Sequence, residues 1–340
     1  MRTLASFAVF ASVLALAAPA AASETVIDTP ARGSVLAARG RTLAYSAYDV
    51  ASKSYRLRIK VGMSAPRDLG VPPRSVPFDV SIARGSIPRG GHSDVLLYSR
   101  CRQEPSGLVG GLPYLRWTTA RDCSLWVAGL GGRERRIVGP PSDAVLPSLS
   151  GATLAFARVP RSGRSSIVVR HIGSHAAELR RFPAPTFAGS PVVVPISLAV
   201  FAGQVAVIWH ADYGDGAVSV LELLHVRSGA RERVRRVAGG SLTGVNFSGP
   251  TWIADGSLHW TEICAGDPEG CPRRHNYGSR SRTGRVTLAP APLRISAYTT
   301  TARAAWTLRN CPSFDLFPDP MSPECQLVQE TPPPLVVRGT

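Results

Sequence analysis

Apolar and polar residues alternate in short runs along most of this chain, and turn-forming residues separate the runs. The clearest example lies at 147–173, where the run TLAFARV is followed by a polar Pro-Arg-Ser-Gly loop and the run SIVVRHI. Strands of about four to eight residues rich in Val, Ile and Phe, separated by turns that contain Gly or Pro, are typical of an antiparallel meander. No run after residue 22 shows the helical apolar period of about 3.6 residues. The pattern therefore predicts an all-β protein.

The meander unit recurs six times, and one aromatic position marks each copy. The aromatic lies in the middle of the second strand of its unit, at Tyr45, Tyr98, Phe156, Trp209, Trp260 and Trp306. Consecutive positions are separated by 46 to 58 residues. A repeat of roughly 40–50 residues with several strands per copy is typical of propeller blades. We therefore expect a six-bladed β-propeller made of four-stranded antiparallel blades.

Two segments are candidates for closing the ring. The run ETVIDTP at 24–30 precedes the first unit. A leftover terminal strand often joins the last blade of a propeller, because this removes the open edge of the ring. The C-terminal residues 331–340 are the alternative closing strand, or they lie outside the sheet. The sequence leaves this choice open.

The first 22 residues have the pattern of a secretory signal peptide. A basic start at Met1-Arg2 is followed by an apolar stretch, and the small residues Pro19-Ala-Ala-Ala22 follow. We expect cleavage after Ala22 and a secreted or periplasmic protein, with an uncleaved membrane anchor as the alternative. No later run approaches the roughly 18 apolar residues that a membrane span needs. Because glycines and prolines are spread between the strands, we expect one domain over residues 23–340.

Six cysteines in a chain with an export signal predict disulfide bonds, since the exported compartment is oxidising. Three of them lie a few residues beyond a blade aromatic, and the other three come next in the chain. We expect each pair to close the loop between the second and third strands of one blade, as Cys101–Cys123, Cys264–Cys271 and Cys311–Cys325. The spacings contain no C-x-x-C motif, which disfavours a zinc site. We expect no metal and no cofactor.

The formal net charge is +16, from 39 Lys and Arg against 23 Asp and Glu. A basic surface is typical of proteins that bind polyanions. Here, however, the arginines recur on the expected fourth strand of the blades, in the runs PRDLGV, RERRIVG, ELRRFP and RERVRRV. Charges on an edge strand prevent pairing with other chains. Edge protection and the arginine bias of a GC-rich genome are therefore favoured over nucleic-acid binding, and we expect a monomer.

One stretch resembles a known family. Residues 250–260, Pro-Thr-Trp-Ile-Ala-Asp-Gly-Ser-Leu-His-Trp, are similar to the P-x-W-S-P-D-G-x-x-L-x-F repeat of TolB-like propellers. Residues 147–156 form a weaker copy, and Leu125-Trp126-Val127 with Gly132 to Val138 is similar to the continuation of that repeat. The resemblance implies the propeller fold, and it does not imply a particular function.

The candidate binding surface is the face that carries the long loops at 101–123, 210–217, 264–276 and 310–325. In a meander propeller these loops share one face with the connections between blades, and function often lies on loops that a rigid scaffold positions. In and beside them lie aromatic and charged residues of the kind that bind ligands: Tyr114, Trp117, His210, Asp212, Tyr213, Asp215, His275 and Tyr277. The alternative is that these loops are solvated and packed by their own side chains.

Other chemistry has weaker support. Asp212 and Asp215 could hold a calcium ion, but Asp-Gly is first of all a hairpin turn. The carboxylates Glu222, Asp255 and Glu262 lie at different strand positions, and no spacing predicts that two of them meet as an acid and a base. No G-x-S-x-G motif is present. Nothing linear in the sequence predicts catalysis.

The sequence thus favours a secreted, non-catalytic binding module whose long-loop face holds a protein or an envelope or extracellular polysaccharide. The alternative is an exported propeller hydrolase or lyase that acts on an anionic carbohydrate, with a site assembled from single residues of several blades. A carboxylate, a histidine and a tyrosine within about 6 Å at the channel mouth would favour the enzyme. Small and apolar side chains there would favour the binding module.

Overall fold

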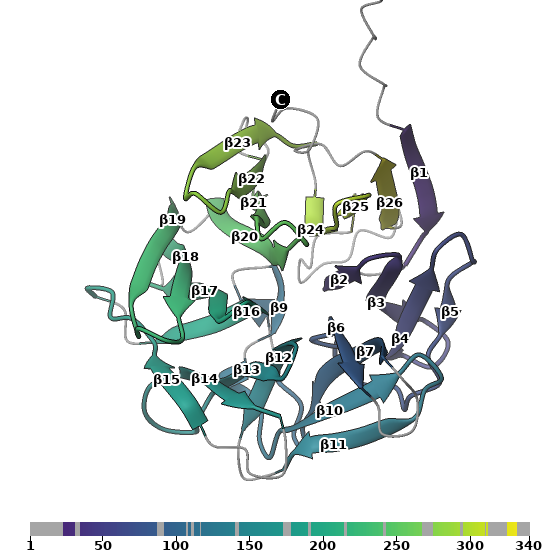
Figure 1. The fold of residues 1–340 in the computed structure, drawn as a ribbon, viewed down its shortest axis with the longest axis horizontal. Coiled ribbons are helices and arrows are strands. Elements are labelled where there is room, and N and C mark those ends of the chain that lie inside the picture. The colour runs from purple at the N-terminus through teal and green to yellow at the C-terminus, as the bar shows by residue number, and fades with distance from the viewer. Residues whose placement is uncertain are drawn as a thin grey trace, which may run out of the picture.

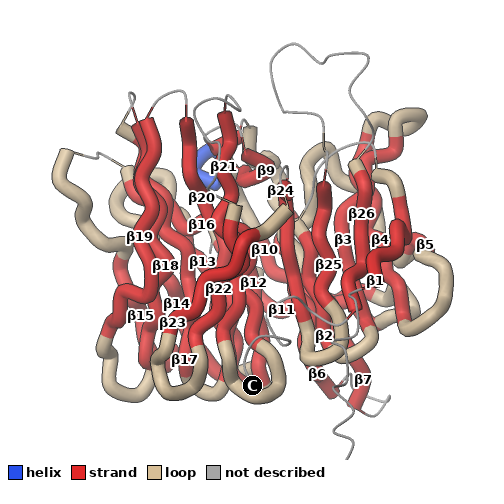
Figure 2. Tube along the Cα trace, turned by 90° about the horizontal axis from the view of Figure 1, so that it is seen from above, coloured by secondary structure: helices blue, strands red, loops and turns tan. Residues whose placement is uncertain are grey.

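A computed structural model describes residues 23–30, 35–86, 92–106, 108–109, 112–115, 117–139, 143–172, 178–189, 192–213, 216–240, 243–266, 275–292, 295–309, 311 and 325–331. Six four-stranded antiparallel sheets stand in a ring (Figure 1). Their strands run between the two faces of a disc (Figure 2). The predicted six-bladed β-propeller is confirmed.

The strands follow one another around the ring in chain order. Blades one to three consist of β2 (Leu36–Arg39), β3 (Thr42–Asp49), β4 (Ser54–Val61) and β5 (Arg67–Asp68); β6 (Ser81–Ser86), β7 (His92–Arg100), β10 (Ser124–Gly129) and β11 (Glu134–Val138); and β12 (Ala144–Ser150), β13 (Thr153–Arg158), β14 (Ser166–His171) and β15 (Glu178–Pro183). Between β7 and β10 lie the small pair β8 (Leu108–Val109) and β9 (Leu112–Leu115) and the 3₁₀ helix η1 (Trp117–Thr119).

The second half of the ring repeats the same order. Blades four to six consist of β16 (Val193–Phe201), β17 (Gln204–Asp212), β18 (Gly216–His225) and β19 (Arg231–Gly240); β20 (Thr243–Trp252), β21 (Leu258–Gly266), β22 (Asn276–Arg280) and β23 (Val286–Pro290); and β24 (Ile295–Thr300), β25 (Ala305–Arg309), β26 (Gln326–Thr331) and β1 (Ser23–Asp28).

The N-terminal strand closes the ring. β1 pairs antiparallel with β26, with Ser23 opposite Thr331 and Val26 opposite Val328, and Figure 1 shows it on the outside of blade six. The first and last described strands therefore meet in one sheet, which leaves no open gap between the first and last blades. Residues 332–340 lie outside the described part of the chain.

The six repeat aromatics all lie in the second strand of their blades, as predicted, and each is at most 4% exposed. Four of them also donate a hydrogen bond to another strand. The indoles of Trp209 and Trp306 donate to Glu222 and Gln329 on the next strand of the same blade. The hydroxyl of Tyr98 donates to Glu134 on the outermost strand of its blade, and that of Tyr45 donates to Asp28 on β1 of blade six. Six apolar clusters, one between each pair of neighbouring blades, form the core.

Blade five has an unusual third strand. Its third strand is β22, with the sequence NYGSR, a stretch whose residue pattern predicts a loop. The reason is Gly278, which lies directly opposite Trp260. A Cβ atom at this glycine would lie 2.1 Å from the indole of Trp260. The absence of a side chain at Gly278 leaves space for the Trp260 ring, and β22 therefore lacks the usual apolar pattern.

Two of the three predicted disulfides are present, Cys101–Cys123 and Cys311–Cys325. The predicted partner of Cys264, Cys271, lies outside the described residues. The first disulfide closes the long loop of blade two at its base. Within that loop Trp117 is only 3% exposed and packs into the cluster between blades three and four. The loop therefore braces two other blades.

The arginine-rich runs lie on the outermost strands, as predicted. They fall on or beside β5, β11, β15 and β19, each of which is the last strand of its sheet. Several of these arginines are paired: Arg231 with Glu222, Arg235 with Glu262 and Arg181 with Glu178. The first two pairs tie β19 to other strands, and the third lies within β15, so some of the arginines stabilise the sheets in addition to charging their edges.

Candidate functional site

The two faces of the disc differ in their connections. One face carries the short turns between first and second strands, and we call it the turn face. The other carries the loops between second and third strands, and we call it the loop face. Figure 2 shows η1 and β9 of the blade two loop at the loop face.

Three of the residues predicted for the loop-face site are core side chains. Trp117, His210 and Tyr277 are 2–3% exposed. His210 lies within β17, where its Nδ1 is 3.0 Å from the hydroxyl of Ser219. The hydroxyl of Tyr277 donates to Glu330 at 3.0 Å, and burial raises its pKa. These three positions are buried, so they do not present a binding surface.

The remaining predicted residues are scattered over three blades. Asp212 is exposed at the end of β17, and Tyr213 follows it half-buried. His275 precedes β22 and is half-buried, and burial lowers its pKa. Tyr114 lies in β9, and Asp215 lies outside the described residues. A binding surface built from this set stays a prediction.

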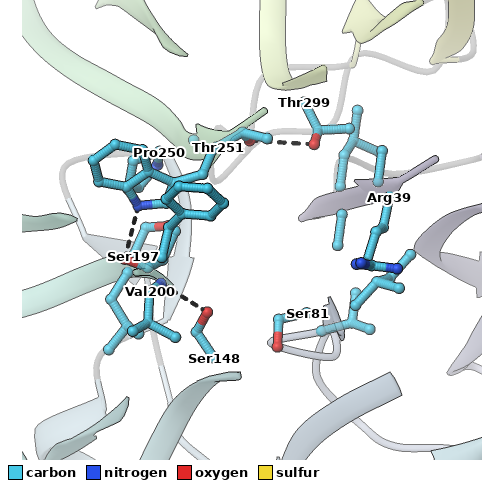
Figure 3. Close-up of a pocket in the computed structure, with 18 of the residues that line it drawn as sticks. Arg39, Ser81, Ser148, Ser197, Val200, Pro250, Thr251 and Thr299 are labelled. Carbon is cyan, nitrogen blue, oxygen red and sulfur yellow. Dashed lines mark hydrogen bonds between the residues drawn. The ribbon is translucent and has the colours of Figure 1, made fainter. Parts of the chain in front are cut away.

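A central channel lies between the first strands of the six blades. Its volume is about 590 Å³, and the first strand of every blade lines it. Figure 3 shows its walls, with Arg39 and Ser81 on one side and Ser148 and Thr251 on the other. The volume is in the range of small-molecule sites, roughly 300–1,000 Å³.

Hydroxyl groups and small apolar side chains make up most of the channel wall. The serines and threonines of the wall come from five blades: Ser81, Ser148, Ser150, Ser197, Thr251, Ser296, Thr299 and Thr301. Three of them tie neighbouring blades together. Ser148 accepts the Val200 N–H at 3.0 Å, and the hydroxyls of Thr251 and Thr299 lie 3.2 Å apart (Figure 3). The wall thus combines hydrogen-bonding groups with a rigid frame.

Three arginines line the channel at its turn-face end: Arg39, Arg84 and Arg303. Arg39 ends β2, and its Nη1 donates to Asp94 Oδ1 at 2.9 Å while 42% of the side chain stays exposed. Asp94 also accepts the hydroxyl of Thr42 at 2.6 Å. The aspartate therefore orients the guanidinium and leaves its other N–H groups available. Arg84 and Arg303 are exposed and have no carboxylate within 4 Å among the described residues.

The one carboxylate on the described channel wall has a structural role. Asp79 is 5% exposed, and it accepts the backbone N–H groups of Ser99 at 2.8 Å and Leu146 at 2.7 Å. Leu146 lies at the bulge of β12 and has a left-handed φ of 53°, so this bond ties blade two to a strained position in the first strand of blade three. Tyr298, the one tyrosine of the described lining, is 1% exposed, and burial raises its pKa.

The channel arginines are absent from the residues predicted from the sequence. A signal for two of them is present: Arg39-Gly40 and Arg84-Gly85 stand at the same place in their repeats, where the first strand of the blade ends. An alignment of the first strands places both arginines at the same rim of the channel. Arg303 has no such signal, because it lies in the turn between β24 and β25.

Comparison with known proteins gives structural neighbours only. No protein-family model matches the chain, and no curated protein matches it. A protein of unknown function from Dyadobacter fermentans is 9% identical, with a TM-score of 0.49 over 90% of this chain and 96% of that one. A luciferin-regenerating enzyme is 9% identical, with a TM-score of 0.48 over 91% and 95%. A prolyl endopeptidase is 12% identical, with a TM-score of 0.40 over 84% of this chain but 39% of that one.

The chain spans well under half of the prolyl endopeptidase chain that it matches. At these identities the neighbours provide no basis for assigning an activity to this chain. No helix among the described residues is long and apolar enough to cross a membrane.

Proposed function

We propose that this protein is a non-catalytic binding module that takes an anionic saccharide into its central channel from the turn face. The observation that carries the proposal is the half-exposed Arg39 guanidinium, oriented by Asp94, at the mouth of a hydroxyl-lined channel. A guanidinium recognises a carboxylate with two parallel hydrogen bonds. Serine and threonine hydroxyls can both donate to and accept from sugar hydroxyls. A uronic acid chain offers both kinds of group.

The same lining argues for binding over turnover. Hydrolysis or elimination needs a general acid and a base within hydrogen-bond reach of the reacting atoms. Asp79 already accepts two backbone N–H groups and lies beside Arg74. No histidine lines the described channel. The groups that remain available are cations and hydroxyls, which bind an anion without transferring a proton.

The test is calorimetric titration of the chain with oligogalacturonate, and with neutral malto-oligosaccharides as the comparison. We expect the acidic oligomer to bind and the neutral one to bind at least tenfold more weakly, since a charged hydrogen bond contributes about 1.5–3 kcal/mol. Replacing both Arg39 and Arg303 with Gln should remove the preference. The matched control is Arg236→Gln, an exposed arginine on the outer strand β19.

Two outcomes would overturn the proposal. Equal affinity for acidic and neutral oligomers would show that the arginines do not select the ligand. Release of new reducing ends, or of an unsaturated product that absorbs in the ultraviolet, would show turnover and favour the hydrolase or lyase.

Three further expectations from the sequence remain proposals. A protein or polysaccharide partner on the loop face has support from the blade two loop, which the Cys101–Cys123 disulfide and the buried Trp117 hold rigid. Export to an oxidising compartment has support from the two disulfides. Kinship with TolB-like propellers has support from the blade five turn, where Asp255 accepts the Ser257 N–H at 2.7 Å and Gly256 has a φ of 82°.

A further inference from the structure

A second cavity lies between blades two and three. Its volume is about 510 Å³, and we call it the blade 2–3 groove. Arg84, Leu149 and Gly151 line both this groove and the central channel, so the two cavities adjoin near the turn face. The saccharide site proposed above does not use the groove, and its volume is in the range of small-molecule sites.

The walls of the groove are aliphatic. They consist of one or two branched side chains from each of several strands and one connection: Val95, Leu97, Val127, Ile137, Leu149 and Ile172. All of these belong to the apolar cluster between blades two and three or pack against it. The groove is therefore an unfilled part of a core interface, and apolar chain atoms would gain from burial there.

The rim of the groove is positively charged. Arg84, Arg133 and Arg135 line it and are exposed, and none of them has a carboxylate within 4 Å among the described residues. The one acidic residue in the lining is Glu134. Its carboxylate is held elsewhere, by the hydroxyl of Tyr98 and by Arg100 at 3.1 Å. The groove thus joins an aliphatic floor to uncompensated guanidinium groups.

We propose that the blade 2–3 groove binds a free single-chain anionic amphiphile, with a fatty acid as its simplest form. The alkyl chain lies along the aliphatic walls, and the carboxylate pairs with Arg133 and Arg135. A wholly polar anion would leave the aliphatic walls uncovered. A neutral apolar chain would make no use of the arginines, and a cationic amphiphile would be repelled by them.

The first test is a chain-length series. Hexanoate, octanoate, decanoate and laurate, each below its micelle concentration, are titrated into the chain by calorimetry. We expect each added methylene to tighten binding roughly three- to fourfold until the groove is filled. Decanol and decyltrimethylammonium are the neutral and cationic comparisons and should bind far more weakly than decanoate. Affinity that does not change with chain length would overturn the proposal.

The second test shows which residues bind the carboxylate of the ligand. Arg133→Gln combined with Arg135→Gln should weaken laurate binding by about tenfold or more, because two charged hydrogen bonds are lost. The matched control is Arg136→Gln, since Arg136 is an exposed arginine on the same strand β11 that does not line the groove. An equal loss in the control would reduce the effect to general surface charge. Melting temperatures of the three proteins should agree, because all these side chains are exposed.

A third arm separates a free fatty acid from a membrane surface. Sedimentation with anionic lipid vesicles should pellet the Arg136→Gln variant and the unchanged chain alike, and only weakly. Strong vesicle binding without binding of monomeric laurate would overturn the proposal. Oligogalacturonate binding tests the channel separately, so the failure of one site leaves the other measurable.

Discussion

The interface between blades four and five and the interface between blades two and three are built from strands in the same positions, but only the first is filled at the turn face. There Phe201 stacks on Trp252, with ring centroids 5.6 Å apart. The Trp252 indole also donates to the Ala199 carbonyl at 3.3 Å. The first strands of blades two and three carry Gly85 and Leu149 instead, and a cavity of about 510 Å³ remains.

This difference shows which features of the fold are general and which are local. The ring needs each blade to be wedged against the next, and second-strand aromatics do this at five of the six interfaces. Between blades five and six, Tyr277 and Tyr298 do it instead. The end of the first strand is less constrained, since it borders the channel on one side. Side-chain volume there decides whether an interface is closed by aromatic rings or left open as a groove. The ligand site proposed between blades two and three follows from small side chains on a standard backbone.

The largest contrast should come from truncating the filled interface. Trp260 is fully buried in the cluster between blades four and five, and Trp260→Ala should destabilise the protein by about 3–5 kcal/mol. Leu149→Ala should cost about 1–2 kcal/mol, because Leu149 is only partly buried and already borders two cavities. Urea denaturation measures both. Equal costs would contradict the claim that the two interfaces are packed differently.

Two glycines provide a second contrast. A Cβ atom at Gly278 would lie 2.1 Å from the Trp260 indole, whereas one at Gly85 would lie 2.8 Å from a terminal methyl of Val95 beside the groove. Gly278→Ala should therefore cost about 3 kcal/mol, at the upper end of typical overpacking, and Gly85→Ala about 1 kcal/mol. The difference arises because the Val95 methyl borders the groove and can move into it, whereas the Trp260 indole is fully buried. Thermal melts that rank the two variants in the opposite order would refute this.

Acid should weaken the blade five side of the ring. Burial lowers the pKa of His259 from 6.5 to about 4, so the folded protein holds this imidazole neutral while the unfolded chain takes up a proton. Stability from this group is therefore complete above about pH 6.5, falls as the pH drops towards 4, and levels off below that. A shift of this size corresponds to about 3 kcal/mol. Denaturation curves of His259→Gln should lose this part of the pH dependence, and an unchanged profile would assign it to other groups.

The sequence predicted the repeat far better than the site. A second-strand aromatic every 46 to 58 residues is a periodic signal, so blade number, strand order and two within-blade disulfides followed from it. The burial of the loop-face candidates did not follow from the repeat, because residue type does not reveal burial. Trp117 and His210 look like loop residues in the sequence and are core residues in the fold. Cavities are harder to predict from a sequence than the burial of single residues. The groove depends on side chains from two blades, and no linear pattern records the space between them.

The smallest effect tests whether the groove is only an unfilled volume. Leu149→Phe adds ring volume at the border of the groove and the channel, where an aromatic closes the interface between blades four and five. Cavity-filling substitutions commonly stabilise by about 0.5–2 kcal/mol, so we expect a gain of about 1 kcal/mol in urea denaturation. The same variant should bind laurate more weakly, because the ring occupies the space that the alkyl chain would take.

A matched change, Leu154→Phe, enlarges a second-strand leucine that is fully buried between blades two and three and lines neither cavity. It should destabilise the protein, since overpacking a filled part of the core costs free energy. If Leu149→Phe instead destabilises the protein while laurate binding persists, the ring does not enter the groove and the amphiphile lies elsewhere.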